Sequence, residues 1–228
     1  MDKTVPKAAA VILDFIGKIE APQGYDTIYG NNQRKLPKQI TKMTLDELIL
    51  AQKSWNYGSS ASGRYQFMRN TLLDLKRELK LTGEEIFDAN FQDRLGFHLL
   101  KRRGYEKFMQ KQISTTMFGK YLAMEWASLP VLAESQGRHR GVPRGSSYYA
   151  GDRLNKALVK PEAVEAMLAR ALAAKGRSVG PVEVLVGGGA GGAAVAAYAG
   201  IEPWIIVALL VLVAAGAVAL ILRKKGKL

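Results

Sequence analysis

Apolar residues near the start of the chain recur at the spacing of one face of a helix. They are Val11, Ile12, Phe15, Ile16 and Ile19, which lie one, three or four positions apart. This period places them on one side of an α-helix and predicts an amphipathic helix over residues 5–20. Asp14 and Lys18 interrupt the apolar run, so it does not form the apolar core of a secretory signal peptide.

Similar periodicity and helix-start residues predict that most of residues 1–175 is helical. Thr44 and Thr82 each precede a glutamate by three positions, the pattern of a capping box at a helix start. The further predicted helices are 44–53, 70–80, 83–88, 90–102, 105–111, 115–127 and 161–175. Extended structure is predicted only at 25–30 and 63–67. The expected fold class is therefore α+β, mainly helical with one small β-sheet.

The polarity of the chain changes sharply after this region. Residues 176–202 are dominated by glycine and alanine, and we interpret them as a linker or a marginal second membrane span. Residues 203–222 contain no charged side chain, and as a helix they would extend about 30 Å, the thickness of the hydrocarbon core of a bilayer. We therefore predict a transmembrane helix at 203–222, followed by a basic tail at 223–228.

Composition limits the chemistry that the chain can carry. There is no cysteine, and the two histidines, His98 and His139, lie far apart, so we expect no disulfide, no metal and no cofactor. The net charge of +13 favours polyanions as partners: nucleic acid, acidic membrane surfaces or anionic wall polymers. Because the basic residues are dispersed and no nucleic-acid-binding motif is present, we expect no nucleic-acid partner.

Two segments carry candidate chemistry. Residues 58–67, GSSASGRYQF, combine a flexible turn with a polar and aromatic strand edge, which fits a sugar or peptide contact and equally a solvated hairpin. Glu20 lies at the end of the first predicted helix, where Pro22 and Gly24 stop it. Partial burial there would raise the pKa of Glu20 towards the value that a general acid needs at neutral pH. Its position alone also fits a solvated glutamate at a helix end.

Five segments occur in an order that resembles a known group of enzymes. They are IEAPQGYDTIYG at 19–30, ITKMTLDELILAQ at 40–52, SASGRYQF at 60–67, EWASLP at 125–130 and SYYAGDRLN at 147–155. Over about residues 10–160 the chain resembles the phage-lambda-type endolysins and the wider group of phage-lysozyme-like muramidases. The resemblance implies a lysozyme-like α+β catalytic domain at 1–175, in which a small sheet and a helical lobe flank a saccharide groove.

The resemblance also implies a substrate and a set of site residues. The substrate is peptidoglycan, cut at the β-1,4 bond between N-acetylmuramic acid and N-acetylglucosamine, with Glu20 as the catalytic acid. The implied substrate-binding residues are Tyr25, Asp26, Arg64, Tyr65, Gln66, Tyr148 and Tyr149. Gln66 is expected to donate hydrogen bonds to the substrate and Tyr65 to stack against a sugar. Trp126, at a helical period within MEWASLP, is more typical of a core residue than of a ligand contact.

Two versions of the chemistry stay open. A hydrolysing glycosidase needs a second carboxylate, for which Asp26 is the nearby candidate. A lytic transglycosylase of the lambda type needs only one glutamate, because the C6 hydroxyl of the muramic acid attacks its own ring and forms a 1,6-anhydro product. The interval between Glu20 and Tyr25 is shorter than in lambda's own enzyme, which leaves the choice of product open.

The predicted membrane helix suggests where the protein acts. It fits a phage lysis system on the inner membrane of the host, with the domain acting on the periplasmic wall, or a virion membrane protein that opens the wall during entry. Lysis-system or virion components are then possible partners, besides peptidoglycan and the bilayer. Basic residues flank 203–222 on both sides, so the positive-inside rule does not settle the orientation. An alternative function is a non-catalytic, membrane-anchored wall-binding or virion structural protein.

Overall fold

The structure, a computed structural model, describes residues 1–152 and 154–175. Its α-helices are α1 (Lys7–Glu20), α2 (Leu45–Ser54), α3 (Arg69–Glu78), α4 (Ala89–Arg102), α5 (Tyr105–Met109), α6 (Thr115–Glu125) and α7 (Pro161–Lys175). Two 3-10 helices, η1 (Tyr29–Lys35) and η2 (Ile40–Lys42), lie between α1 and α2. Strands β1 (Ser135–Gln136) and β2 (Gly141–Val142) form an antiparallel hairpin between α6 and α7. The predicted α+β class, mainly helical with a small sheet, is confirmed.

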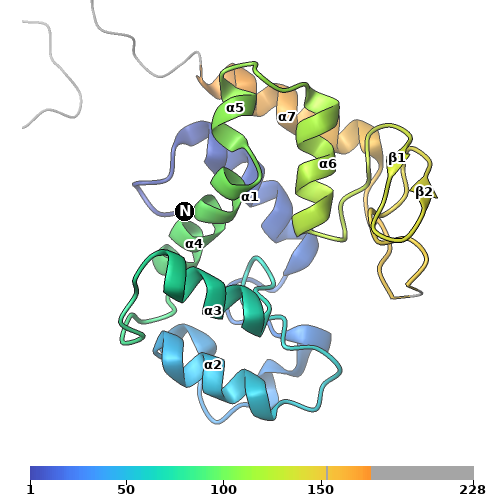
Figure 1. Ribbon diagram of the computed structural model, residues 1–228. Coiled ribbons are helices and arrows are strands. Elements are labelled where there is room, and N and C mark those ends of the chain that lie inside the picture. Colours follow the sequence, from blue (N-terminus) through green and yellow to red (C-terminus); the bar gives the residue numbers. More distant parts are fainter. Residues whose placement is uncertain (153, 176–228) are drawn as a thin grey trace, which may run out of the picture. The chain divides into compact units, whose positions relative to one another are not determined.

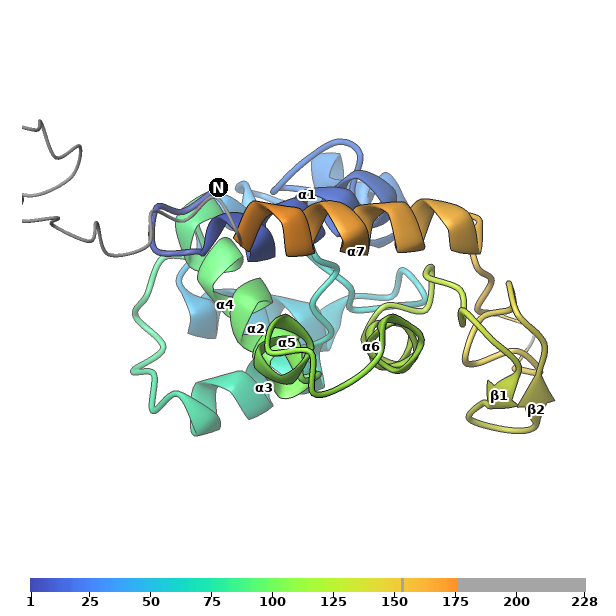
Figure 2. The same ribbon diagram turned by 90° about the horizontal axis from the view of Figure 1, so that it is seen from above.

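The helices pack in two groups. Helices α2 and α3 pack on each other, and α1, α4, α5, α6 and α7 form the larger group (Figure 1). Helix α7 lies along α1, as the view from above shows (Figure 2). The C-terminal end of α1 is directed towards the smaller group (Figure 1).

Helix α1 supplies much of the core of the larger group. Its apolar stripe is buried as predicted, with Ile12, Leu13 and Ile16 fully inaccessible to solvent. Buried residues from Val5 to Ala171 form one hydrophobic cluster. Burial of this apolar surface is the main free-energy gain that holds the helices together.

A chain of aromatic rings extends this core under the segment GRYQF. Tyr65 packs edge-to-face on Phe67 with ring centroids 5.9 Å apart, and Phe67 packs in the same way on Phe87 at 5.8 Å. Phe87 in turn meets Phe91 of α4 at 6.4 Å. Such edge-to-face pairs are favourable beyond their buried area, so this segment is fixed to α4 by packing.

One of the two predicted capping boxes is confirmed and the other is not. At the start of α2 the hydroxyl of Thr44 accepts from the N–H of Glu47, and the Glu47 carboxylate accepts from the N–H of Thr44. Thr82 and Glu85 make similar side-chain hydrogen bonds, but no helix follows at 83–88. The backbone there is used instead to pair with the start of α2, since the N–H of Leu45 donates to the carbonyl oxygen of Glu85 at 2.8 Å.

The two predicted strands are wrong. Residues 25–28 and 63–67 form turns with isolated bridges, Ile28 with Ser62 and Ser62 with Phe67, and residues 29–30 begin η1. The turn at 63–67 needs positive φ at Gly63 (77°) and at Gln66 (49°), which a strand does not allow. The small sheet lies instead at 135–142, where no strand is predicted.

The predicted linker at 176–202, transmembrane helix at 203–222 and basic tail at 223–228 lie outside the described residues. Among the helices at 1–152 and 154–175, none has both the length and the apolar composition that crossing a bilayer requires.

Candidate active site

Glu20 is the last residue of α1, at the point where the helix stops. Ala21 leaves the helix with φ −144° and ψ 71°, although its N–H still donates to the carbonyl oxygen of Gly17 at 3.1 Å. The N–H of Gly24 then donates to the carbonyl oxygen of Ala21 at 2.9 Å and turns the chain away. The half-buried side chain of Glu20 is therefore carried by a rigid helix end at the edge of the core.

The carboxyl group of Glu20 is held by Ser128. The Oγ of Ser128 donates to Oε1 of Glu20 at 2.5 Å, and Ser128 is only 7% exposed. Burial raises the pKa of Glu20 above its ordinary value, and the hydrogen bond from Ser128 opposes part of that rise. Among residues 1–152 and 154–175, no neighbouring charge contributes to the shift. The protonated carboxyl is thus favoured by its dry surroundings.

The segment that carries Ser128 is fixed by a later part of the chain. The N–H of Leu158 donates to the carbonyl oxygen of Ser128 at 2.7 Å, and the Oγ of Ser147 donates to that of Ala127 at 3.0 Å. Ser128 was not among the predicted site residues. It lies within the segment EWASLP, but no local pattern distinguishes it from the other serines of the chain.

Gln66 lies in the turn that follows Gly63. The N–H of Gly63 donates to the carbonyl oxygen of Thr27 at 2.7 Å, which fastens the turn to the segment after α1. The Nε2 of Gln66 donates to the carbonyl oxygen of Gly63 at 2.8 Å, so its amide closes its own turn. The predicted donation from Gln66 to a substrate stays a prediction.

The ring of Tyr65 has no free face, so the predicted stacking of Tyr65 on a sugar is wrong in this structure. Tyr65 is 1% exposed, and its hydroxyl donates to Oδ1 of Asp93 at 2.6 Å. Burial, and then Asp93, raises the pKa of Tyr65. Trp126 is buried as predicted, and its Nε1 donates to the carbonyl oxygen of Tyr65 at 3.2 Å. Both side chains therefore belong to the hydrophobic core.

Asp93 connects Tyr65 to other parts of the chain, and no prediction included it. This fully buried carboxylate of α4 accepts from the hydroxyls of Tyr65 and Tyr25, the latter at 2.9 Å, and from the N–H of Asp2 at 2.7 Å. Burial, followed by the charge of Asp93, raises the pKa of Tyr25 to about 12. An aspartate among the apolar positions of a predicted helix indicates a buried acceptor, but its partners are too distant in sequence to be identified.

Arg64 and Tyr25 are brought together beside α1. The guanidinium carbon of Arg64 lies 5.2 Å from the centroid of the Tyr25 ring, and Nη2 lies 3.2 Å from Oδ1 of Asp14. The side chain crosses α1 at Gly17, where an added Cβ would lie 2.5 Å from Nε of Arg64. Two predicted site residues thus meet about one helical turn before Glu20. Their contact with a substrate stays a prediction.

The remaining predicted residues lie at other edges of the site. The Oδ1 of Asp26 accepts from the N–H of Thr41 at 3.0 Å, which ties it to η2. Tyr148 and Tyr149 pack edge-to-face at 5.1 Å, and the hydroxyl of Tyr149 donates to the carbonyl oxygen of Met124 at 2.7 Å. Among the described residues, no hydrogen bond or ion pair joins these three side chains to Glu20.

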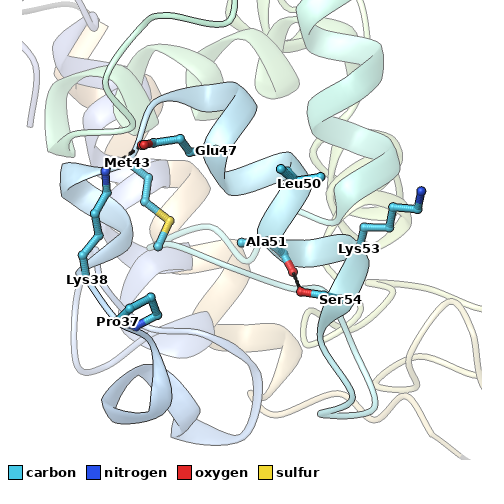
Figure 3. Close-up of a pocket in the computed structure, with 8 residues that line it drawn as sticks. All are labelled: Pro37, Lys38, Met43, Glu47, Leu50, Ala51, Lys53 and Ser54. Atoms are coloured by element: carbon cyan, nitrogen blue, oxygen red, sulfur yellow. Dashed lines mark hydrogen bonds and ion pairs between the residues drawn. The ribbon is translucent and has the colours of Figure 1, made fainter.

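A surface pocket of about 560 Å³ lies along α2 (Figure 3), and none of the predicted site residues lines it. It is lined by Pro37, Lys38, Met43, Glu47, Leu50, Ala51, Lys53 and Ser54. Its carboxylate, Glu47, pairs with Lys38 at 2.7 Å and caps α2, which lowers the pKa of Glu47. The acid of the pocket is therefore occupied by structural contacts, and the pocket offers no alternative catalytic group.

A family model described as Endolysin matches residues 15–145, a range that includes Glu20, the turn at 63–67 and Ser128. Neither the curated proteins nor the solved structures gave a match to the chain. Within residues 1–152 and 154–175, no three metal-binding side chains lie close enough together to hold a metal ion. Because the match spans more than half of the chain, the protein belongs to the endolysin family, phage enzymes that degrade the peptidoglycan of bacterial cell walls.

Proposed function

We propose that this endolysin is a muramidase that cleaves the β-1,4 bond between N-acetylmuramic acid and N-acetylglucosamine, with Glu20 as its general acid. One observation carries the proposal: the carboxyl of Glu20 is shielded from water at a rigid helix end and accepts a hydrogen bond from Ser128. A general acid at neutral pH must keep its proton, and burial without a neighbouring charge favours the protonated form.

Ser128 also distinguishes the two carboxyl oxygens. Because its hydroxyl donates to Oε1, that oxygen acts as the carbonyl oxygen of the protonated acid, and Oε2 carries the proton. In the proposed reaction Oε2 delivers this proton to O4 of the leaving N-acetylglucosamine while the bond from C1 of the muramic acid to O4 breaks. The Glu20 carboxylate left behind then takes a proton from the nucleophile that adds to C1, which restores the acid.

The nucleophile is water in a hydrolase or the muramic acid's own C6 hydroxyl in a lytic transglycosylase. Two carboxyl groups at the short separation of a retaining glycosidase would shift each other's pKa. No carboxylate contributes to the shift of Glu20, and Asp26 accepts from Thr41 instead. These observations favour chemistry with a single glutamate, in which the C6 hydroxyl attacks and a 1,6-anhydro end is formed.

The test uses the full chain in mild detergent and purified peptidoglycan. We expect the wild type to release soluble glycan fragments and Glu20→Gln to release them about 10²–10⁴ times more slowly, since that is the usual contribution of a general acid. Glu84→Gln, at an exposed position, is the matched control and should retain full activity. Equal rates for wild type and Glu20→Gln would refute Glu20 as the acid. Mass spectra of the fragments distinguish 1,6-anhydro ends from reducing ends.

The alternative function, a non-catalytic wall-binding or virion structural protein, predicts binding of peptidoglycan without release of fragments in the same assay.

We further propose that residues 203–222 anchor the enzyme in a bilayer, either the inner membrane of the host or the membrane of a virion. The support for this anchor is the uncharged sequence of 203–222. Fractionation of membranes tests the anchor. The full chain should stay with the membranes after a salt wash, and a chain without residues 203–222 should not.

A further inference from the structure

We propose that the β1–β2 hairpin and the segment that precedes α7 form a contact surface for an anionic lipid bilayer. This hairpin surface consists of Arg138, His139 and Arg140 at the hairpin tip together with Leu154, Lys156 and Leu158. It borders the carboxyl site, because the N–H of Leu158 donates to the carbonyl oxygen of Ser128 at 2.7 Å, and it lies outside the predicted anchor at 203–222.

The apolar part of the hairpin surface is unusually open to solvent. Leu154 is 84% exposed and Leu158 is 66% exposed. Around Leu158 the burial alternates, because Ala157 and Val159 are half-buried while Lys156 and Leu158 are exposed. The extended backbone therefore turns Leu158 outward and uses its neighbours for packing. A single exposed leucine is ordinary, but two within five residues beside a basic tip suggest an apolar partner.

The two arginines of the hairpin tip carry charge that no ion pair compensates in the described part of the chain. Arg138 and Arg140 are exposed, and in the described part of the chain neither forms an ion pair. Arg144 nearby shows the opposite arrangement, since it pairs with Glu162 at 2.8 Å and with Glu165 at 2.7 Å. Unpaired guanidinium groups are attracted to anionic headgroups at a membrane surface.

The two parts lie side by side. An added Cβ at Gly151 would lie 3.8 Å from Cβ of His139 and 3.7 Å from Nε of Arg140, so the chain beyond Tyr149 passes directly over the hairpin tip. Asp152 then accepts from the N–H of Leu154 at 2.9 Å, which fixes the backbone between Gly151 and the exposed leucine. Both views place the hairpin at the outer edge of the domain, where a flat surface can reach it (Figures 1 and 2).

These features favour a bilayer over a glycan. None of the six residues of the hairpin surface is Phe, Tyr or Trp, and the neighbouring Tyr148 and Tyr149 are half-buried and pack on each other. Leucines that project between basic side chains fit an interface in which apolar side chains enter the acyl boundary and cations remain among the headgroups.

The absence of cysteine from the chain permits a local test. The full chain with Leu154→Cys, labelled with an environment-sensitive fluorophore, is mixed with vesicles of phosphatidylcholine alone or with added phosphatidylglycerol. We expect a blue shift of the emission only with phosphatidylglycerol. Leu50→Cys on α2, where the leucine is 70% exposed, is the matched control and should not shift. Because each probe reports only its own surroundings, insertion of residues 203–222 cannot mimic the result.

Charge variants complete the test. In the Leu154→Cys chain, Arg138→Ala with Arg140→Ala should abolish the shift, whereas Lys3→Ala with Lys7→Ala removes the same charge elsewhere and should preserve it. Salt that shortens the screening length from about 30 Å to about 3 Å should also weaken the shift. Equal shifts at positions 50 and 154, or no shift with phosphatidylglycerol, would overturn the proposal. A shift caused by purified peptidoglycan without vesicles would overturn it in favour of a wall contact.

Discussion

Ser128 donates a hydrogen bond of 2.5 Å to Oε1 of Glu20, although 108 positions separate the two residues in the chain. The carboxyl comes from the end of α1, and the hydroxyl comes from the segment after α6. Both elements pack in the larger helical group. The hydrogen bond therefore forms only when this group is folded, and it cannot form in an isolated α1. The protonation of Glu20 is consequently a property of the tertiary structure.

Replacement of Glu20 by glutamine should stabilise the protein at neutral pH. Burial raises the folded-state pKa of Glu20 above its ordinary value of 4.5, so the carboxyl adds no penalty while it is protonated in both states. As pH rises from about 4.5 through the higher folded-state pKa, the wild type must ionise a dry carboxyl and loses stability relative to Glu20→Gln. Melting temperatures across this range should therefore diverge, with the variant higher at neutral pH.

The exposed Glu84→Gln serves as the control for this divergence, since its melting temperature should follow that of the wild type at every pH. A constant difference between Glu20→Gln and wild type across the range would contradict the raised pKa of Glu20.

Removal of the Ser128 hydroxyl should move the pH dependence of the reaction. The hydrogen bond from Ser128 lowers the pKa of Glu20, so Ser128→Ala should raise it further. The basic limb of the rate profile, where Glu20 loses its proton, should then shift to higher pH. The maximum rate should fall by up to about 10²-fold, because the carboxyl is less well oriented. Ser128→Thr keeps a hydroxyl and should restore the position of the limb. An unchanged limb in Ser128→Ala would show that the hydrogen bond does not tune the acid.

Local sequence rules predicted most of the helices. They did not predict that the same capping pattern begins a helix at one place and not at another. Thr44 and Thr82 both precede a glutamate by three positions, and only Thr44 begins a helix. The difference lies in pairing between distant segments, because the backbone of Glu85 accepts from Leu45. A capping pattern is local, whereas this pairing depends on where the two segments meet in the folded chain.

The candidate site likewise contains residues that the sequence indicates and residues that it does not. Glu20 could be proposed as the acid from the end of its helix and from the order of the motifs, since both can be read from the sequence. Ser128 and Asp93 could not be identified, because their importance comes from partners that lie 108 and 28–91 positions away. The predicted stacking of Tyr65 on a sugar does not fit its burial, because a sequence does not show which side of a turn faces the core.

Loss of the Asp93 carboxylate should strongly destabilise the fold. Asp93→Ala leaves the hydroxyls of Tyr25 and Tyr65 and the N–H of Asp2 without their acceptor. Unpaired buried donors of this kind cost about 1–3 kcal/mol each, so we expect a loss of about 3–5 kcal/mol in the free energy of unfolding. Asp93→Asn keeps one acceptor oxygen and should lose less. Urea unfolding monitored by circular dichroism measures both, and equal stability of Asp93→Ala and wild type would refute the role of this network.

Gly17 should be required only because Arg64 crosses the helix there. An added Cβ would lie 2.5 Å from Nε and 2.8 Å from Cγ of Arg64, so Gly17→Ala must displace that side chain from Tyr25 and Asp14. We expect a loss of about 1–3 kcal/mol, the usual cost of overpacking, even though alanine favours a helix by up to about 1 kcal/mol over glycine.

In an Arg64→Ala chain the obstacle is absent, and the same Gly17→Ala change should raise the free energy of unfolding, because only the helix preference remains. Urea unfolding of the four chains of this double-mutant cycle gives the coupling between the two positions directly. A reversal of sign between the two backgrounds would establish that the glycine accommodates Arg64. A destabilising effect of equal size in both would mean that another neighbour of Gly17 sets the limit.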